Sequence, residues 1–371
     1  MVLIGLGFMM SDSGLVALFE KKSSSFAISN FNLQDPVGDQ ILIKVEGCTI
    51  CGSDVHTFLG RRSAQVPAVL GHEIAGRIVS FGPFNKRIDY SGNHLEIGTF
   101  VTWSVVANCD NCIYCKRGQP QKCDSNFKYG HKKHNPEEPW VGGLAEYILL
   151  VHGTKVFKIP EGLSLEVACP ANCTTATNVA AFRVAGNLAG KVVLIMGAGM
   201  LGVTACAMAK FYGAKLVIVC DTNEKRLLKA CEFGADQSTL PAGLSDVVSN
   251  LTAGLGVDII FELTGAPVAF ENAFECVGIG GKIILVGSVF PSAPVGLPME
   301  IIVRKLLSIE GIHNYIPEDL AKALGFLNQT RHLPWESLVG KWFNLSDVDL
   351  AFQLAQSPEY YRVGISDAMN H

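Results

Sequence analysis

The sequence lacks the features of nucleic-acid-binding, secreted and membrane-spanning proteins. Charged residues make up only 17% of the 371 positions and the net charge is −4, so no basic surplus favours a nucleic-acid partner. The opening run Met1–Met10 is apolar, but it is too short to cross a bilayer and has no basic leader or cleavage site. Met9 and Met10 are alternative starts. No repeat or low-complexity segment occurs. We therefore expect a cytoplasmic protein with no nucleic-acid or membrane partner.

Cysteine, by contrast, is abundant, with 12 in the chain. Because nothing points to secretion, we expect these side chains to be reduced thiols and metal ligands rather than disulfides. Hydrophobic residues make up 49% of the sequence, and a chain of this length is large enough for two domains.

The pattern of apolar residues changes along the chain. Up to about residue 160, short alternating runs broken by glycine, proline and asparagine predict a β-rich domain. Near-continuous apolar strands then alternate with helical periods, as is typical of a parallel sheet buried on both faces. The last stretch is expected to pack back onto the first domain. The predicted strands are 40–47, 73–82, 98–106, 192–197, 216–221, 257–265 and 282–288.

Four cysteines follow one another closely, in a C-x2-C-x2-C-x7-C pattern with polar spacers. Such a run brings four thiolates around one point, as a tetrahedral structural zinc requires. An iron–sulfur cluster is the alternative, since four thiolates also suit it, and unconnected or disulfide-bonded cysteines are a further one. The four are Cys109, Cys112, Cys115 and Cys123.

A glycine-rich loop joins the strand at 192–197 to a helical stretch. In a G-x-G-x-x-G loop the first glycine makes the turn, the second admits a pyrophosphate, and the third lets helix and strand pack closely. The next strand ends in Asp221, whose carboxylate would accept ribose hydroxyls and repel a 2′-phosphate. The loop therefore predicts NAD binding, although Lys225 and Arg226 leave NADP open; a turn without ligand is the alternative. Its residues include Gly197, Gly199, Met200, Leu201 and Gly202.

A second set of metal-ligand residues is spread along the chain. Cys51 follows a predicted strand, His72 comes about 20 residues later, and Cys173 lies at the start of the second domain. Three protein ligands with an open fourth position are typical of catalytic zinc. Each residue alone would more commonly belong to the packed interior.

These motifs together resemble the zinc-dependent medium-chain dehydrogenases of the alcohol dehydrogenase superfamily, along nearly the whole chain. Residues 47–56, GCTICGSDVH, resemble the family's first-ligand motif, and residues 71–82, GHEIAGRIVSFG, its GHE-x-x-G motif. The resemblance implies an α/β fold with a GroES-like β-rich catalytic domain, 1–165 and 325–371, around a doubly wound parallel-sheet (Rossmann) NAD-binding domain, 166–324. It also implies two zinc ions per chain, one catalytic and one structural.

Roles for residues near the catalytic zinc follow from the same resemblance. Cys51 and His72 would be ligands, Glu73 would lie beside the metal and sometimes enter its shell, and Asp54 would orient His72. Counting back from the end of the helix that leads into the second domain favours Cys173 as the third ligand, with Cys169 as the competitor.

The resemblance further implies a hydride transfer between NAD and an alcohol, with zinc acting as a Lewis acid. Ser53 would take the proton from the substrate oxygen and pass it through the nicotinamide ribose to His56 near the surface. A helix cap and a solvated loop are the simpler roles for these two residues. Thr177, Thr264 and Gly287 are expected to complete the cofactor site.

Substrate identity is less constrained. Arg61 and Arg62 are candidates to line the substrate entrance, as are cations within 128–134, and arginine pairs bind phosphate or carboxylate well. A solvated charged face is the alternative. Residues 58–73, FLGRRSAQVPAVLGHE, and 169–177, CPANCTTAT, resemble alcohol dehydrogenases associated with phosphonate catabolism, so an anionic hydroxyalkyl phosphonate competes with a primary or secondary alcohol or polyol. Arg362 is expected either to reach the pyrophosphate or to be a surface charge.

Other hypotheses predict different residues or cofactors. A zinc-free quinone reductase would leave the ligand cysteines unexplained, and an iron–sulfur electron carrier would not bind NAD. A regulatory, non-enzymatic paralogue that retains only NAD binding is the main alternative. Relatives are usually homodimers or homotetramers, and the strand at 282–290 with the apolar stretch after it is a candidate for subunit pairing.

Overall fold

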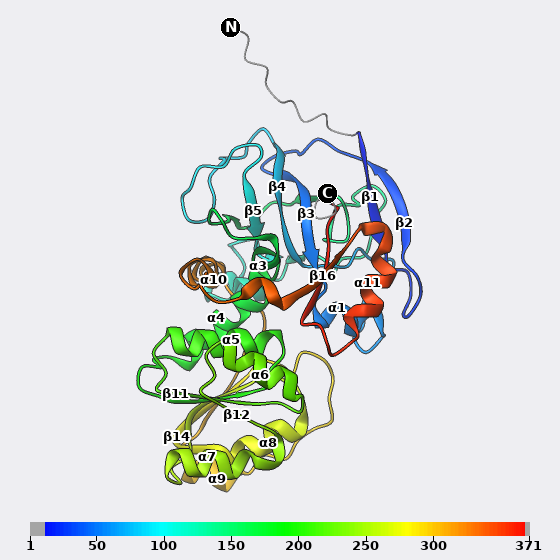
Figure 1. Ribbon diagram of the computed structural model, residues 1–371. Coiled ribbons are helices and arrows are strands. Elements are labelled where there is room, and N and C mark those ends of the chain that lie inside the picture. Colours follow the sequence, from blue (N-terminus) through cyan, green and yellow to red (C-terminus); the bar gives the residue numbers. More distant parts are fainter. Residues whose placement is uncertain (1–11, 368–371) are drawn as a thin grey trace.

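The computed structural model describes residues 12–367, so the alternative starts at Met9 and Met10 lie outside the described residues. The molecule has a β-rich part, at the top of Figure 1, and a part built on a parallel sheet, at the bottom. Helices join the two parts. None of the helices in the described range is long and apolar enough to cross a membrane.

The β-rich part contains a seven-stranded sheet made from both ends of the chain. Its strand order is β16-β17-β3-β4-β5-β9, and β8 pairs with β3. The C-terminal strand β17 pairs antiparallel with β3, so the last stretch completes the sheet begun by the first. The strands are β3 (Ile41–Thr49), β4 (Glu73–Phe81), β5 (Phe100–Trp103), β8 (Tyr147–Leu150), β9 (Val156–Lys158), β16 (Val339–Phe343) and β17 (Arg362–Ile365).

Shorter elements surround this sheet. Two small antiparallel pairs, β1 with β2 and β6 with β7, flank it. Short helices occupy the connections and the C-terminal return. The strands of these pairs are β1 (Ser13–Leu18), β2 (Ala27–Asn32), β6 (Val106–Ala107) and β7 (Phe127–Lys128). The short helices are α1 (Gly52–Phe58), α2 (Ile113–Lys116), η1 (Pro120–Lys122), η4 (Trp335–Leu338), η5 (Leu345–Asp347) and α11 (Val348–Ala355).

The second part is a six-stranded, all-parallel sheet with the order β12-β11-β10-β13-β14-β15. Numbered by sequence within the sheet, this is the 3-2-1-4-5-6 order of dinucleotide-binding folds. The apolar runs predicted as strands form its centre because both faces are covered by helices. The strands are β10 (Val192–Met196), β11 (Leu216–Cys220), β12 (Gln237–Thr239), β13 (Val257–Glu262), β14 (Val277–Leu285) and β15 (Ser308–Gly311).

Helices cover both faces of the parallel sheet. Helices α5 and α6 lie on the face turned toward the β-rich part, and α7, α8 and α9 lie beyond the other face (Figure 1). The helices of this part are α5 (Met200–Phe211), α6 (Glu224–Glu232), η3 (Pro241–Gly243), α7 (Leu244–Thr252), α8 (Pro267–Cys276), α9 (Met299–Arg304) and α10 (Pro317–Gln329).

The two parts share one hydrophobic core around the helices that join them. This core runs from residues of the β-rich part, such as Phe157, to residues of the parallel sheet, such as Phe261. The joining segment is α3 (Leu165–Pro170), a π-helical turn η2 (Ala171–Thr175) and α4 (Ala176–Ala185). Pro170 cannot donate a helical hydrogen bond, which explains why the regular helix gives way to a wider turn here.

The structure differs from the sequence-based expectation in several details, and strands β1, β2, β7, β8, β9, β16 and β17 were not predicted individually. The strand predicted at 98–106 divides into β5 and β6, because the Ser104 hydroxyl bonds to the carbonyl of Val106 and turns the chain. The short strands β12 and β15 had no clear apolar run and were not predicted. They lie at the two edges of the parallel sheet, where each strand has only one neighbouring strand. An edge strand is less completely covered than a central one, so its sequence does not have to be continuously apolar.

Candidate active site and metal centres

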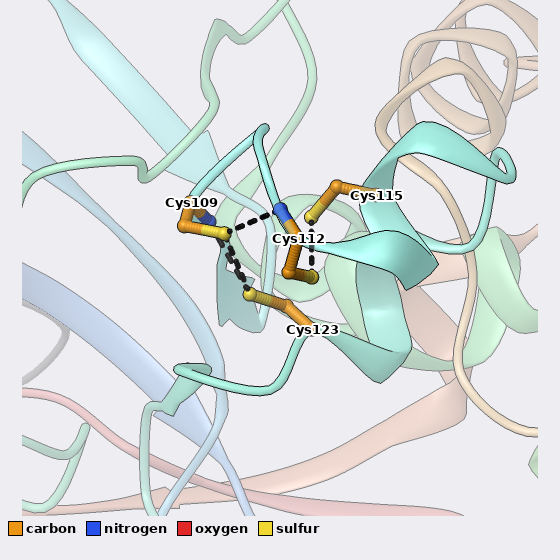
Figure 2. Close-up of side chains that lie close together, drawn as sticks. All are labelled: Cys109, Cys112, Cys115 and Cys123. Carbon is orange, nitrogen blue, oxygen red and sulfur yellow. Dashed lines mark hydrogen bonds between the residues drawn. The ribbon is translucent and has the colours of Figure 1, made fainter.

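Four cysteine side chains meet in the lobe between β6 and β7, as Figure 2 shows. The sulfur atoms of Cys109 and Cys123 are 3.5 Å apart, and those of Cys112 and Cys115 are 3.6 Å apart. These separations are too long for disulfides. They are close to the edge of a tetrahedron with metal–sulfur bonds of about 2.3 Å, which is about 3.8 Å.

The backbone of the lobe donates to these sulfurs. Amide groups of Cys109 and Cys112 donate to the sulfurs of Cys123 and Cys109, each over 3.3 Å. Backbone amides, from Asn111 first, lower the pKa of Cys109 to about 6, so a thiolate forms readily. Thiolates this close together fit one ion, whereas a cluster that binds each thiolate through a different iron would hold them farther apart. The donor set therefore fits zinc.

A second donor set brings together Cys51, His72 and Cys173, whose ligand atoms all lie within 4.8 Å of one another. Cys51 precedes the first turn of α1, His72 precedes β4, and Cys173 lies in the π-helical turn. The Cys173 sulfur is 3.5 Å from His72 Nε2. One zinc ion bound by a thiolate and an imidazole would hold them about 3.6 Å apart, so the set fits the metal.

His72 is oriented by its neighbours. Its Nδ1 lies 3.2 Å from Asp54 Oδ1, and because a carboxylate only accepts, this nitrogen is the donor. Nε2 is thereby directed toward the donor set, with Ser53 Oγ at 3.5 Å. Such a carboxylate–histidine pair is the usual support of a zinc-bound imidazole.

Cys173 belongs to this set and Cys169 does not. Cys169 is fully buried in the shared core, one helical turn earlier. Hydrogen bonding from Cys173 holds the pKa of the Cys51 thiol well below its ordinary value, and the same contact raises the pKa of Cys173. Cys51 is thus the first of the two to ionise.

Glu73 lies beside the donor set, but its carboxylate forms an ion pair with Arg362. The guanidinium donates from Nε and Nη2 to the two carboxylate oxygens, each over 2.7 Å. Thr49 and Thr174 contact the same carboxylate. Arg362 is buried, so the expectation of a surface charge is wrong; burial and ion pairing in the interior are the reason. It also lies 3.5 Å from the Cys51 sulfur.

The glycine loop lies where β10 ends and α5 begins. Gly197 has φ +99°, a conformation that favours glycine, and a Cβ at Gly202 would lie 1.8 Å from the Gly197 carbonyl oxygen. At Gly199, by contrast, a Cβ would meet no atom within 4 Å. The open space there is where a cofactor phosphate would approach the helix N-terminus, so the loop fits a dinucleotide.

Asp221 follows β11 and lies next to this loop. Its Oδ2 accepts from the amide of Ala198 over 2.6 Å, and its Oδ1 accepts from the amide of Asn223 over 2.8 Å. Each oxygen retains a lone pair for a further hydrogen bond. Arg226 packs over the Tyr361 ring and donates to the carbonyl of Pro358.

The later loops meet the same site. Thr264 and Gly287 both line the central cavity. Buried Glu262 accepts from the amides of Thr264 and Gly265, over 2.7 and 2.9 Å, and so fixes the loop after β13. Glu262 was not among the predicted site residues, although a carboxylate at the end of an apolar strand is an available signal.

A cavity of about 280 Å³ joins these features. Its walls include the donor set, Ser53, His56 and Thr177 from one side and the glycine loop from the other. Phe290, His313 and Tyr315 also line it and were not predicted. Recognition of β15 as a strand would have pointed to the last two, since they follow its carboxyl end.

The basic residues around the cavity occupy different places. Arg62, Lys128 and His131 line it, whereas Arg61 is exposed and lies outside the lining. His56 contacts Phe290 with ring centroids 4.5 Å apart. Burial, followed by Arg61, lowers the pKa of His56.

Comparison with known proteins identifies the family. Residues 38–161 match the alcohol dehydrogenase GroES-like domain, and residues 201–329 match the zinc-binding dehydrogenase model. The L-threonine 3-dehydrogenase of Pyrococcus furiosus is 32% identical over 310 residues, covering 82% of this chain and 84% of that protein. The chain belongs to the zinc-dependent medium-chain dehydrogenase family. It is accordingly an oxidoreductase of the zinc alcohol dehydrogenase type.

Other members of the family show the same extent of similarity. The sorbitol dehydrogenase of Halalkalibacterium halodurans is 28% identical over 341 residues, covering 91% of this chain and 94% of that protein. The crystal structure of an alcohol dehydrogenase from Thermotoga maritima is 29% identical with a TM-score of 0.90, covering 95% and 99% of the two chains. The predicted fold class, a GroES-like part with a Rossmann-type parallel sheet, is thus confirmed.

Proposed function

We propose that this family member oxidises the hydroxyl group of a small alcohol with NAD⁺, or reduces the matching carbonyl with NADH. One observation carries the proposal: the Cys51–His72–Cys173 donor set and the glycine loop face the same cavity. A metal site and a hydride acceptor must reach the same carbon atom for this chemistry, and a shared cavity allows it.

A zinc ion held by these three residues would polarise the substrate oxygen, and bound NAD⁺ would accept the hydride. Ser53 Oγ, beside His72, is placed to take the hydroxyl proton as the hydride leaves the substrate carbon. Its own proton would pass to His56, which lines the same cavity and is partly exposed. The lowered pKa of His56 keeps its imidazole neutral at neutral pH, as a proton acceptor requires.

NAD is proposed over NADP because of Asp221. A carboxylate at the end of the second strand favours ribose hydroxyls and repels a 2′-phosphate. Of the two cations that leave NADP open, Arg226 is engaged by the Tyr361 ring and the Pro358 carbonyl, and Lys225 is exposed. Thr177, Thr264 and Gly287 line the same cavity and are proposed cofactor contacts.

The second zinc is proposed to be structural and bound by Cys109, Cys112, Cys115 and Cys123. The limits 1–165 and 325–371 for the catalytic domain, and 166–324 for the NAD domain, belong to the same proposal. Primary or secondary alcohols and polyols are the proposed substrates, including those that carry a phosphate or phosphonate group.

The Cys51→Ser variant tests the assignment. We expect it to lose turnover and the catalytic zinc while keeping NAD⁺ affinity, because the donor set and the glycine loop are separate. NADH formation at 340 nm, zinc content by mass spectrometry and NAD⁺ titration are the three measurements. Cys231→Ser, which changes an exposed cysteine on α6 that belongs to neither metal set, is the control and should match the parent protein.

Full activity of Cys51→Ser would contradict the catalytic zinc. The alternative, a regulatory paralogue that binds NAD without catalysis, predicts NAD⁺ binding to the zinc-loaded parent protein but no NADH from any alcohol in a panel of alcohols and polyols.

A further inference from the structure

One part of the cavity wall carries a cation without a partner. Lys128 ends β7, and its side chain is largely withdrawn from solvent yet lines the catalytic cavity. Within residues 12–367, its ammonium group makes no hydrogen bond, and no carboxylate lies within the 4.0 Å of an ion pair. A buried charge is costly unless it is paired.

Arg62 lies on the same wall and is held there by His131. His131 Nδ1 is 2.9 Å from the Tyr129 carbonyl, which can only accept, so this nitrogen carries the proton. Nε2 then accepts from Arg62 Nη1 over 3.1 Å. His131 is therefore neutral and positions the guanidinium, whose other N–H groups stay available.

The same three side chains also line a second cavity of about 340 Å³. Among the described residues, no aspartate or glutamate lines either cavity. The walls that surround Lys128 and Arg62 therefore contain no carboxylate, and the only acidic groups there are the thiols of the donor set.

The neighbouring sites do not neutralise these cations. Two thiolates, Cys51 and Cys173, would balance one zinc ion, and Glu73 is matched by Arg362. With zinc bound, the Asp54 carboxylate stays on His72, and no carboxylate pairs directly with Lys128 or Arg62. A concave site of one sign attracts ligands of the opposite sign.

Burial and then Arg62 lower the pKa of Lys128 to about 8, against the smaller opposing effects of Cys173 and Cys51; Lys122 also lowers it. A cation held at such a cost is stabilised when an anion binds next to it. An anionic ligand in the cavity would thus supply the negative charge beside Lys128 that the protein itself lacks.

We propose that Lys128 and Arg62 form a subsite for the anionic group of the substrate, a carboxylate or a phosphate-type group on a short hydroxy compound. This proposal rests on the proposed function, and it assigns recognition to Lys128 with Arg62 rather than to the Arg61–Arg62 pair. His131 is a positioning residue for Arg62.

Turnover tests the substrate class. kcat and KM are measured with NAD⁺ for 3-hydroxypropylphosphonate, 4-hydroxybutanoate and the neutral 1-butanol. We expect the better anion to exceed 1-butanol by ~100-fold in kcat/KM, and the two anions separate the phosphonate from the carboxylate source. Equal or better turnover of 1-butanol would overturn the proposal.

Variants test the residue. Lys128→Met should raise KM for the anionic substrate by ~30-fold or more, with kcat and the kinetics on 1-butanol nearly unchanged. Lys128→Arg should recover most of the loss, since it restores the charge. Lys133→Met, an exposed lysine of the same segment, is the control. Equal losses on both substrate types would indicate a structural role instead.

Binding without turnover separates the two proposals. Methylphosphonate and acetate, which lack a hydroxyl group, are titrated calorimetrically into the zinc-loaded, NAD⁺-bound protein. At least ~10-fold weaker binding of either anion to Lys128→Met than to Lys133→Met supports the subsite even if no alcohol is oxidised. Unchanged binding of both anions overturns it, whether or not the protein is an active dehydrogenase.

Discussion

His56 lies at the edge of the cavity, with its ring against Phe290 and its Nδ1 buried without a hydrogen-bond partner in the described structure. Burial, then Arg61 and Arg62, lower its pKa from the ordinary value, whereas Cys51 has an opposing effect. A histidine that must accept a proton works only when neutral. Alcohol oxidation should therefore be lost as the pH falls through this lowered pKa.

Arg61→Gln should move that limit. Removing an exposed positive neighbour raises the pKa of His56, so the acid limb of the kcat/KM profile for 1-butanol should shift upward by ~0.2–0.5 pH unit. Lys133→Gln is the control for loss of a surface charge. A downward shift, or an acid limb that persists unchanged in His56→Gln, would exclude His56 from the proton path.

At the scale of residues, the sequence predicted which residues belong to the site better than it predicted which side chains they contact. Spacing and resemblance singled out Cys51, His72 and Cys173, and the structure places their ligand atoms together. The pairing of Arg362 with Glu73 joins residues 289 positions apart, and no local pattern encodes such a contact. The same holds for Arg62 and His131, which are 69 positions apart.

At the scale of elements, the cysteine lobe has little to hold it together apart from a metal. Its helix α2 has four residues and its turn η1 has three, and none of these is buried. Elements this short do not persist on their own. The lobe also reaches the cavity, because Lys122 Nζ lies 2.5 Å from Nδ1 of His313.

Cys112→Ser should consequently yield insoluble protein or lower the melting temperature, since binding of a structural zinc contributes directly to folding. Thermal unfolding and zinc content are the measurements, with Cys231→Ser again as the control. A soluble variant with an unchanged melting temperature would contradict a structural zinc at this lobe.

The predictability of elements followed their burial. The central strands of the parallel sheet were identified from apolar runs, because both of their faces are covered. The edge strands β12 and β15 have no such run. The π-helical turn that carries Cys173 follows Pro170, whose missing N–H is a local signal for an irregular helix, although the residue alone does not determine a turn of π type.

At the scale of the whole molecule, the two parts of the segment expected to pair subunits differ in exposure, and the apolar stretch after the strand is the exposed part. The strand β14, within the predicted pairing segment, is bonded to β13 on one side and β15 on the other, so it offers no free edge. In the described part of the sheet, the edge strand next to β14 is β15. Exposed apolar residues lie on the segment before it: Leu297, Met299, Val303 and Leu306.

We predict that the chain is a homodimer or homotetramer that uses this surface. The double variant Val303→Lys with Leu306→Lys should then be a monomer by light scattering coupled to gel filtration, because buried charges oppose association. Leu228→Lys, which charges an exposed leucine on α6, should keep the parent state. A monomeric parent protein would contradict the prediction.

The place of β17 in the sheet also bears on how the protein is made. Glu73 is synthesised early, but Arg362, whose guanidinium pairs with the Glu73 carboxylate, is added 289 residues later. Until then β3 lacks its antiparallel neighbour β17, and the pocket around the cysteine and histidine ligands lacks a wall. Because domains generally fold in the order of their synthesis, we expect the parallel-sheet part to form on the nascent chain while the β-rich part still lacks its last strand. We expect a nonsense codon shortly before Arg362 to leave folding of the parallel-sheet part intact and to prevent folding of the β-rich part.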